Sequence, residues 1–217
     1  MVKALAIKEL RESLGLIVLG LIGAVGVVGP LMGVAVVPWK GAAETWNPFV
    51  NEMHLEKQGF LLGIFAFVLG LKQTAWEIHQ GTFRYLLHRP ISRNKVFLVK
   101  LLIGTAAIVA VNGFMILLYA WWSATPGNHP SPFFWSMTYP SWQLALSLLI
   151  VYLSAFLSGV RQARWIGTRL VPVALGGACV YVINTSQAWW WYSLLLGLPS
   201  AVAMLIAIFY YIHHSDQ

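Results

Sequence analysis

Charged residues are scarce in this chain. Only 10% of its 217 residues are Asp, Glu, Lys or Arg, whereas 59% are hydrophobic, and the mean hydropathy is +0.71. Soluble domains carry roughly 25% charged residues. A soluble fold has no way to bury so much apolar surface, so the composition predicts an integral membrane protein. The basic excess lies beside apolar runs instead of forming one soluble patch, which argues against nucleic acid as a partner.

Several chemistries lack the residues that they need. Cys179 is the one cysteine and lies inside an apolar run, so an intrachain disulfide is excluded. The sequence contains neither the phosphate-binding pattern GxxxxGK[ST] nor the zinc-binding pattern HExxH. We therefore expect no ATPase activity on this chain and no catalytic, cofactor-binding or metal-binding residues. Proton-driven carriers place titratable groups within the bilayer, and no predicted span has Asp or Glu at its centre.

Charge-free runs predict an all-α membrane domain that covers residues 1–217. A helix needs roughly 20 apolar residues to cross the hydrocarbon. The runs, separated by turn-rich or polar breaks, predict six transmembrane helices near residues 13–38, 57–78, 96–122, 141–160, 166–184 and 191–212. Both termini then lie on the same side of the membrane.

An amphipathic segment precedes the first predicted span. Apolar residues at helical spacing share one arc, and charged residues take the opposite arc, namely Val2, Ala6, Leu10 and Leu14 against Lys8, Glu9, Arg11 and Glu12. This pattern predicts a helix that lies in the membrane interface. The alternative is a charged flank that only helps to orient the first span.

Basic residues are distributed unequally between the two sides of the predicted domain. Three precede the first span, six lie between the second and third spans, and three lie between the fourth and fifth. They are Lys3, Lys8, Arg11, Lys72, Arg84, Arg89, Arg93, Lys95, Lys100, Arg161, Arg164 and Arg169. The other side has only Lys40 and Lys57. The positive-inside rule therefore predicts that this basic side and both termini face the cytoplasm.

Small and aromatic residues form two further groups. Gly26, Gly29 and Gly33 in the first span, and Gly176 and Gly177 in the fifth, allow close helix packing, either within the chain or between two subunits. Pro30 is expected to kink the first span. Tryptophans gather near the predicted outer ends of spans, as in an interfacial aromatic belt. Trp189, Trp190 and Trp191 are alternatively candidates for an outer gate that contacts cargo.

Residues 69–102, LGLKQTAWEIHQGTFRYLLHRPISRNKVFLVKLL, resemble the signature region of ABC transporter permeases of the type-2 exporter class. That family shows a glutamate at the inner end of the second span, then Gly-Thr, two leucines, Pro-x-Ser-Arg and a later lysine. The matching residues here are Glu77, Gly81, Thr82, Leu86, Leu87, Pro90, Ser92, Arg93 and Lys100. The charged, arginine-rich positions after the glutamate are replaced by Ile78-His79-Gln80, and the large external domain of some relatives is absent.

The resemblance implies a cytoplasmic coupling helix that docks on a separate ATPase subunit. Its contact residues would be Gly81, Thr82, Phe83, Arg84, Leu86, Leu87, His88, Arg89 and Pro90. Glu77 would pair with a basic residue, either Arg84 or a residue of the N-terminal helix. Ser92 is suited to capping the next helix, with Arg93, Lys95 and Lys100 at the membrane surface.

The implied function is the membrane-spanning subunit of an ATP-driven exporter in a bacterial-type inner membrane. Two copies, or one copy and a paralogue, would form the pathway, and the partner ATPase would bind ATP and Mg. In type-2 relatives the first and fifth spans make the dimer contact. The cargo, and the choice between homodimer and heterodimer, stay open.

Three alternatives stay open beside this interpretation. The basic segment between spans two and three is alternatively a positive-inside loop without a partner. The chain is alternatively a membrane anchor or accessory subunit of a redox or cofactor-maturation complex, with His213 and His214 near a cofactor. The third alternative, a secondary carrier, is disfavoured by the missing intramembrane carboxylates.

Overall fold

The computed structural model describes residues 2–33, 48–49, 52–80, 92–128, 132–161, 168–185 and 190–214, and these ranges contain helices but no strands. The prediction of an all-α chain is confirmed for them. The long helices are α1 (Val2–Leu31), α2 (Glu52–Leu71), α5 (Arg93–Ala124), α6 (Tyr139–Val160), α7 (Val171–Thr185) and α8 (Trp190–His214). The π-helical turn η1 (Lys72–Trp76) and the short helix α3 (Glu77–His79) continue α2, and the 3-10 turn η2 (Trp135–Thr138) leads into α6.

Five helices in the described part of the chain are long and apolar enough to cross a membrane. These are α1, α2 with its continuation, α5, α6 with its 3-10 start, and α8. They are the helices of a multi-pass membrane protein. The remaining apolar helix, α7, has only 15 residues, so the helix observed within the predicted span at 166–184 is shorter than a typical crossing.

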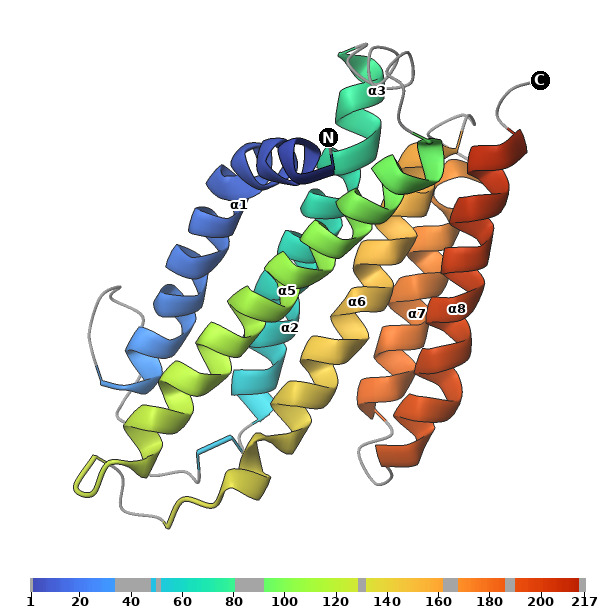
Figure 1. Cartoon of the computed structure of the whole chain (residues 1–217). Coiled ribbons are helices and arrows are strands. Elements are labelled where there is room, and N and C mark those ends of the chain that lie inside the picture. The colour runs from blue at the N-terminus through green and yellow to red at the C-terminus, as the bar shows by residue number, and fades with distance from the viewer. Residues whose placement is uncertain are drawn as a thin grey trace.

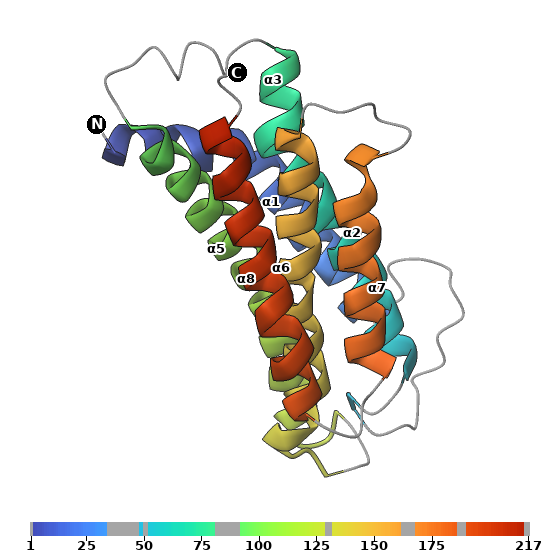
Figure 2. The same cartoon turned by 90° about the vertical axis from the view of Figure 1, so that its right-hand side faces the viewer.

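Helix α6 occupies the centre of the bundle. It packs against α2, α5, α7 and α8, while α1 lies along α5 and α2 on one side of the bundle (Figures 1 and 2). The side chains of α6 are the most enclosed among the candidate spans, and those of α1 and α8 are the least enclosed. The outward residues of α1 and α8 are apolar, such as Leu19, Ile22, Leu195 and Ile206, as expected for helices that face lipid.

Tyr152 of α6 shows how closely the central helices approach one another. Its side chain is fully buried and lies directly over Gly104 of α5, where an added Cβ would come within 2.1 Å of the phenolic oxygen. On α2, a Cβ at Gly70 would lie 2.7 Å from the carbonyl oxygen of Tyr152. Glycine at both positions therefore permits the backbone contacts that build the core.

Helix α1 joins two predicted elements. The amphipathic segment and the first span form one uninterrupted helix, whose first turns run across one end of the bundle before it turns along the other helices (Figure 1). Pro30 lies in the last turn of this helix. Gly33 follows the helix with a φ of +80°, and its backbone N–H donates to the carbonyl of Pro30. The helix therefore ends in a left-handed cap, where glycine carries no steric cost.

We call the end of the bundle where α1 and α5 begin and α8 ends the basic end (Figure 1). Basic residues of the described ranges gather there, namely Lys3, Lys8, Arg11, Lys72, Arg93, Lys95, Lys100, Arg161 and Arg169. At the opposite end the described ranges contain Lys57, and the exposed Trp121 and Trp135 lie there as well. This asymmetry of charge and tryptophan is the one that the sequence predicted.

Candidate functional site: a buried ion cluster

Three helices contribute charged side chains to one buried cluster at the basic end. Lys100 of α5 is fully buried, and its Nζ lies 2.6 Å from Oε1 of Glu77 in α3 and 2.8 Å from Oε1 of Glu9 in α1. Glu77 and Glu9 are only 6% and 1% exposed. We call these three residues the ion cluster. Each ammonium–carboxylate contact is a charge-assisted hydrogen bond, the stronger class of hydrogen bond in proteins.

The helical spacing of α1 explains how Glu9 reaches the cluster. Leu5, Glu9 and Ser13 recur every four residues and all three are buried, so they share the face that points into the bundle. Leu5 packs against the first turns of α5. The opposite residues Leu10 and Leu14 are about half exposed. The sequence placed Glu9 on the charged arc with Lys8, Arg11 and Glu12. In the structure Glu9 alone of these four is buried against the bundle, while Arg11 and Glu12 are exposed.

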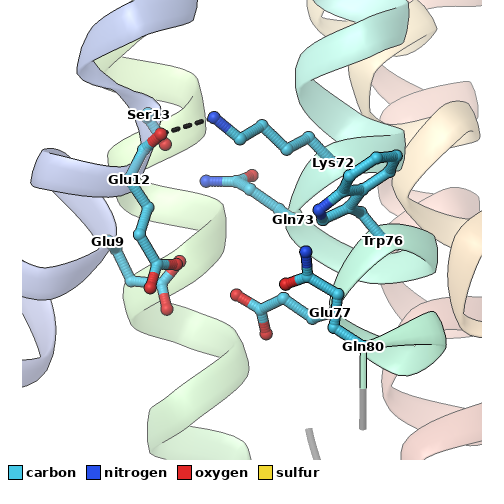
Figure 3. A pocket seen from close by; sticks show the side chains of 8 residues that line it. All are labelled: Glu9, Glu12, Ser13, Lys72, Gln73, Trp76, Glu77 and Gln80. Atoms are coloured by element: carbon cyan, nitrogen blue, oxygen red, sulfur yellow. Dashed lines mark hydrogen bonds between the residues drawn. The ribbon is translucent and has the colours of Figure 1, made fainter. Parts of the chain in front are cut away.

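Two more lysines surround the ion cluster. Nζ of Lys8 lies 3.7 Å from Glu9, 3.3 Å from Glu12 and 3.9 Å from Glu77, and Lys72 donates to the backbone carbonyl of Glu12. Figure 3 shows the carboxylates of Glu9, Glu12 and Glu77 converging from α1 and α3. Their oxygens lie within 4.8 Å of one another, a spacing that suits a metal ion. Lys8 and Lys100 supply positive charge among them, so the arrangement is that of an ion-pair network.

A chain of hydrogen bonds links the ion cluster to the core. The hydroxyl of Tyr152 donates to Oε1 of Gln73 over 2.7 Å, and Nε2 of Gln73 donates to the backbone carbonyl of Lys100 over 3.2 Å. Gln73 belongs to the π-helical turn η1, where Thr74 donates to the carbonyl of Gly70. Single π-helical turns within α-helices occur frequently at functional sites. The cluster thus connects α1, α3, α5, η1 and α6.

A polar cavity of about 250 Å³ opens beside the ion cluster, between α1 and the end of α2. Side chains of both helices line it (Figure 3), namely Glu9, Glu12, Ser13, Lys72, Gln73, Trp76, Glu77 and Gln80. Among the described residues, the lining contains no cysteine, serine–histidine pair or histidine cluster, and it offers charge and hydrogen bonds.

The structure corrects parts of the predicted site. Glu77 contacts Lys8 of the N-terminal helix, as predicted, but its closer partner is Lys100. Lys100 is buried, so its predicted position at the membrane surface is wrong. Ser92 occupies the N-cap position of α5 without a side-chain capping bond, while Lys95 is exposed and Arg93 partly buried. The predicted coupling residues, Gly81 to Pro90, lie outside the described residues.

The glycines predicted at an interface fall into two groups. Gly29 is buried within the chain, and a Cβ at Gly176 would lie 2.6 Å from the Ser154 hydroxyl, so these two serve internal packing. Nothing in the described structure lies within 4 Å of a Cβ placed at Gly26, Gly33 or Gly177. Of the candidate outer gate, Trp189 and the side chain of Trp190 lie outside the described residues, and Trp191 is 39% exposed in the first turn of α8.

Comparison with known proteins identifies no relative of this chain. No protein-family model matches the chain, and neither a curated protein nor a solved structure matches it.

Proposed function

We propose that this chain is the membrane-spanning subunit of an ATP-driven exporter of the type-2 ABC class. It acts as a dimer with itself or a paralogue, and separate subunits hydrolyse ATP. The support is the resemblance across residues 69–102 together with one observation. The resembling segment around residues 81–91 is flanked by α3 and α5, which the Lys100–Glu77 contact joins directly.

Mechanical transmission needs elements that move together. A force on the segment 81–91 reaches α3 on one side and α5 on the other, and Glu9 ties α1 to both. Buried polar contacts fix the register of helices in some proteins, and we propose the same role for the ion cluster. The ion cluster therefore suits a device that converts movement at the basic end into movement of three helices.

The proposed topology follows from the charge distribution. The basic end faces the cytoplasm, α7 completes a sixth crossing, and the first turns of α1 lie in the cytoplasmic interface with Leu10 and Leu14 toward lipid. Both termini then lie in the cytoplasm, where an ATPase reaches the basic end.

Co-purification tests the partnership. The tagged chain is purified from cells that also produce a candidate ATPase subunit, and ATP hydrolysis is measured after reconstitution. Leu86→Asp places a charge on the apolar face of the proposed coupling helix and is expected to reduce ATPase recovery severalfold. Phe134→Asp, an exposed apolar site at the opposite end, is the matched control and leaves recovery unchanged. Equal recovery with both variants contradicts the docking role.

Transport provides the second measurement. Gly81→Pro and Arg89→Glu are expected to preserve membrane insertion while separating ATP hydrolysis from export. Full activity of the isolated chain in proteoliposomes without any nucleotide would instead identify a secondary carrier.

A further inference from the structure

A second cavity lies on the outer side of α1 and α2, next to the polar one. It has a volume of about 510 Å³, within the range of roughly 300–1,000 Å³ typical of ligand pockets. Its wall is apolar, with Leu16 of α1 facing Val68, Leu71 and Ala75 of α2 and η1. Val68 is 38% exposed, so the wall lies at the outer surface of two candidate membrane spans. We call this cavity the α1–α2 groove.

One end of the α1–α2 groove is polar. Lys72, Trp76 and His79 complete its lining, and they lie toward the basic end of the bundle. Trp76 is 58% exposed, as is typical of tryptophans at the headgroup level of a bilayer. The ammonium of Lys72 has three hydrogens and donates one to the carbonyl of Glu12, which leaves donors for a further acceptor.

This order of side chains matches an amphiphile with a negative head. From the chemistry of the lining we infer that the α1–α2 groove binds one anionic phospholipid from the leaflet at the basic end. An acyl chain lies against Leu16, Val68 and Leu71, and the phosphate group lies beside Lys72 and His79. Charge complementarity selects the occupant, because the described residues of the basic end carry a lysine and arginine excess that attracts anionic headgroups.

The bound lipid has a structural consequence. It contacts α1 through Leu16 and the π-helical turn through Lys72 and Ala75, so it bridges the two helices beside the ion cluster. Lipid binding at this groove requires insertion in a membrane but no ATPase. Loss of lipid binding would therefore leave the proposed exporter function intact, and absence of an ATPase partner would leave the lipid site intact.

Native mass spectrometry of the full chain in detergent tests the site. The protein is titrated with phosphatidylglycerol and with phosphatidylcholine that carry identical acyl chains. We expect phosphatidylglycerol to bind more tightly. Lys72→Gln is expected to weaken its binding about fivefold and to remove the preference between the two lipids. The matched control Lys57→Gln, a partly buried lysine at the opposite end, is expected to change neither affinity.

A second pair of variants tests the apolar wall. Val68→Trp fills the groove and is expected to lower the binding of both lipids, whereas Val202→Trp on the exposed face of α8 does not. Equal affinity of the unmodified protein for both lipids would contradict the proposed anionic specificity. The Lys72→Gln variant tests the same specificity, and its result does not depend on whether Val68→Trp folds. If a folded Val68→Trp variant binds lipid as well as the parent protein does, the α1–α2 groove is not the lipid-binding site. If that variant also loses a dimer present in the parent protein, the occupant is a second copy of the chain.

Discussion

Replacing Lys100 by methionine tests the buried ion cluster most directly. Methionine keeps the length of the side chain but removes the ammonium that contacts Glu9 at 2.8 Å and Glu77 at 2.6 Å. The two carboxylates then remain buried and close together, and Lys8, among the described residues, still contacts them at 3.7 and 3.9 Å. Removing one partner of a buried pair costs about 3–5 kcal/mol of unfolding free energy. Because Lys8 compensates in part, we expect a value near 3 kcal/mol.

Thermal unfolding of the purified protein in detergent measures this loss. The 11 tryptophans of the chain provide the fluorescence signal. For a chain of about this length, each kcal/mol shifts the Tm by about 2–4 °C, so Lys100→Met should lower it by about 6–12 °C. Lys57→Met at the opposite end is the control, and it should leave the Tm unchanged because no buried acid depends on Lys57 in the described structure.

A compensating variant separates charge from packing. Adding Glu9→Gln and Glu77→Gln to Lys100→Met removes all three buried charges while preserving side-chain size. The cost of Lys100→Met comes from leaving two buried carboxylates without their counter-charge, and the triple variant leaves no buried charge uncompensated, so most of the lost Tm should return. A single Lys100→Met variant as stable as the parent, or a triple variant no more stable than the single one, would refute the argument from buried charge.

Two further variants test the packing around Tyr152 in the same assay. Gly104→Ala places a Cβ 2.1 Å from the Tyr152 hydroxyl and should lower the free energy of unfolding by about 1–3 kcal/mol. The control Gly15→Ala points into open space and should not destabilise the protein. Equal stability of these two variants would contradict the close contact. Tyr152→Phe removes the 2.7 Å hydrogen bond to Gln73 and should cost about 1 kcal/mol, and an unchanged Tm would show that this bond contributes nothing.

The long helices could be predicted from the sequence because their limits are marked chemically. The span predicted at 141–160 is helix Tyr139–Val160, and the span predicted at 96–122 is helix Arg93–Ala124. In both cases a charge-free run ends at a basic residue or a turn-rich stretch. The same basic residues, at the ends of the charge-free runs, also allowed the concentration of positive charge at one end of the bundle to be predicted.

The ion cluster could not be predicted in the same way. Glu9 and Lys100 are 91 residues apart, and the pattern of a single helix sorts charged residues onto a polar arc without showing what that arc faces. One signal was present: Lys100 stands among apolar residues of α5, and a lysine in such a position often pairs with a buried acid. The recurrence of Leu5, Glu9 and Ser13 was a second signal, since Glu9 shares their buried face.

The boundary between the amphipathic segment and the first span was also hidden. No proline or turn sequence separates the two parts, so the chain continues as one helix through Leu31. The change from charged to apolar residues reports a change of surroundings, from interface to bilayer, and not the end of a helix. Composition therefore separates two parts of α1 that run in different directions (Figure 1) but belong to one continuous helix.

The triple neutral variant also distinguishes two roles of the ion cluster. Apolar or neutral packing often stabilises a fold as well as a buried ion pair does, so stability alone is a weak reason to bury Lys100, Glu9 and Glu77. If the cluster serves only stability, the triple variant should recover both Tm and ATP-driven export. If it fixes the register of α1, α3 and α5 so that movement at the basic end is transmitted, the variant should recover Tm while export per ATP hydrolysed stays low. Recovery of both would therefore leave the cluster without a mechanical role, and the coupling argument would then depend on residues 81–91 alone.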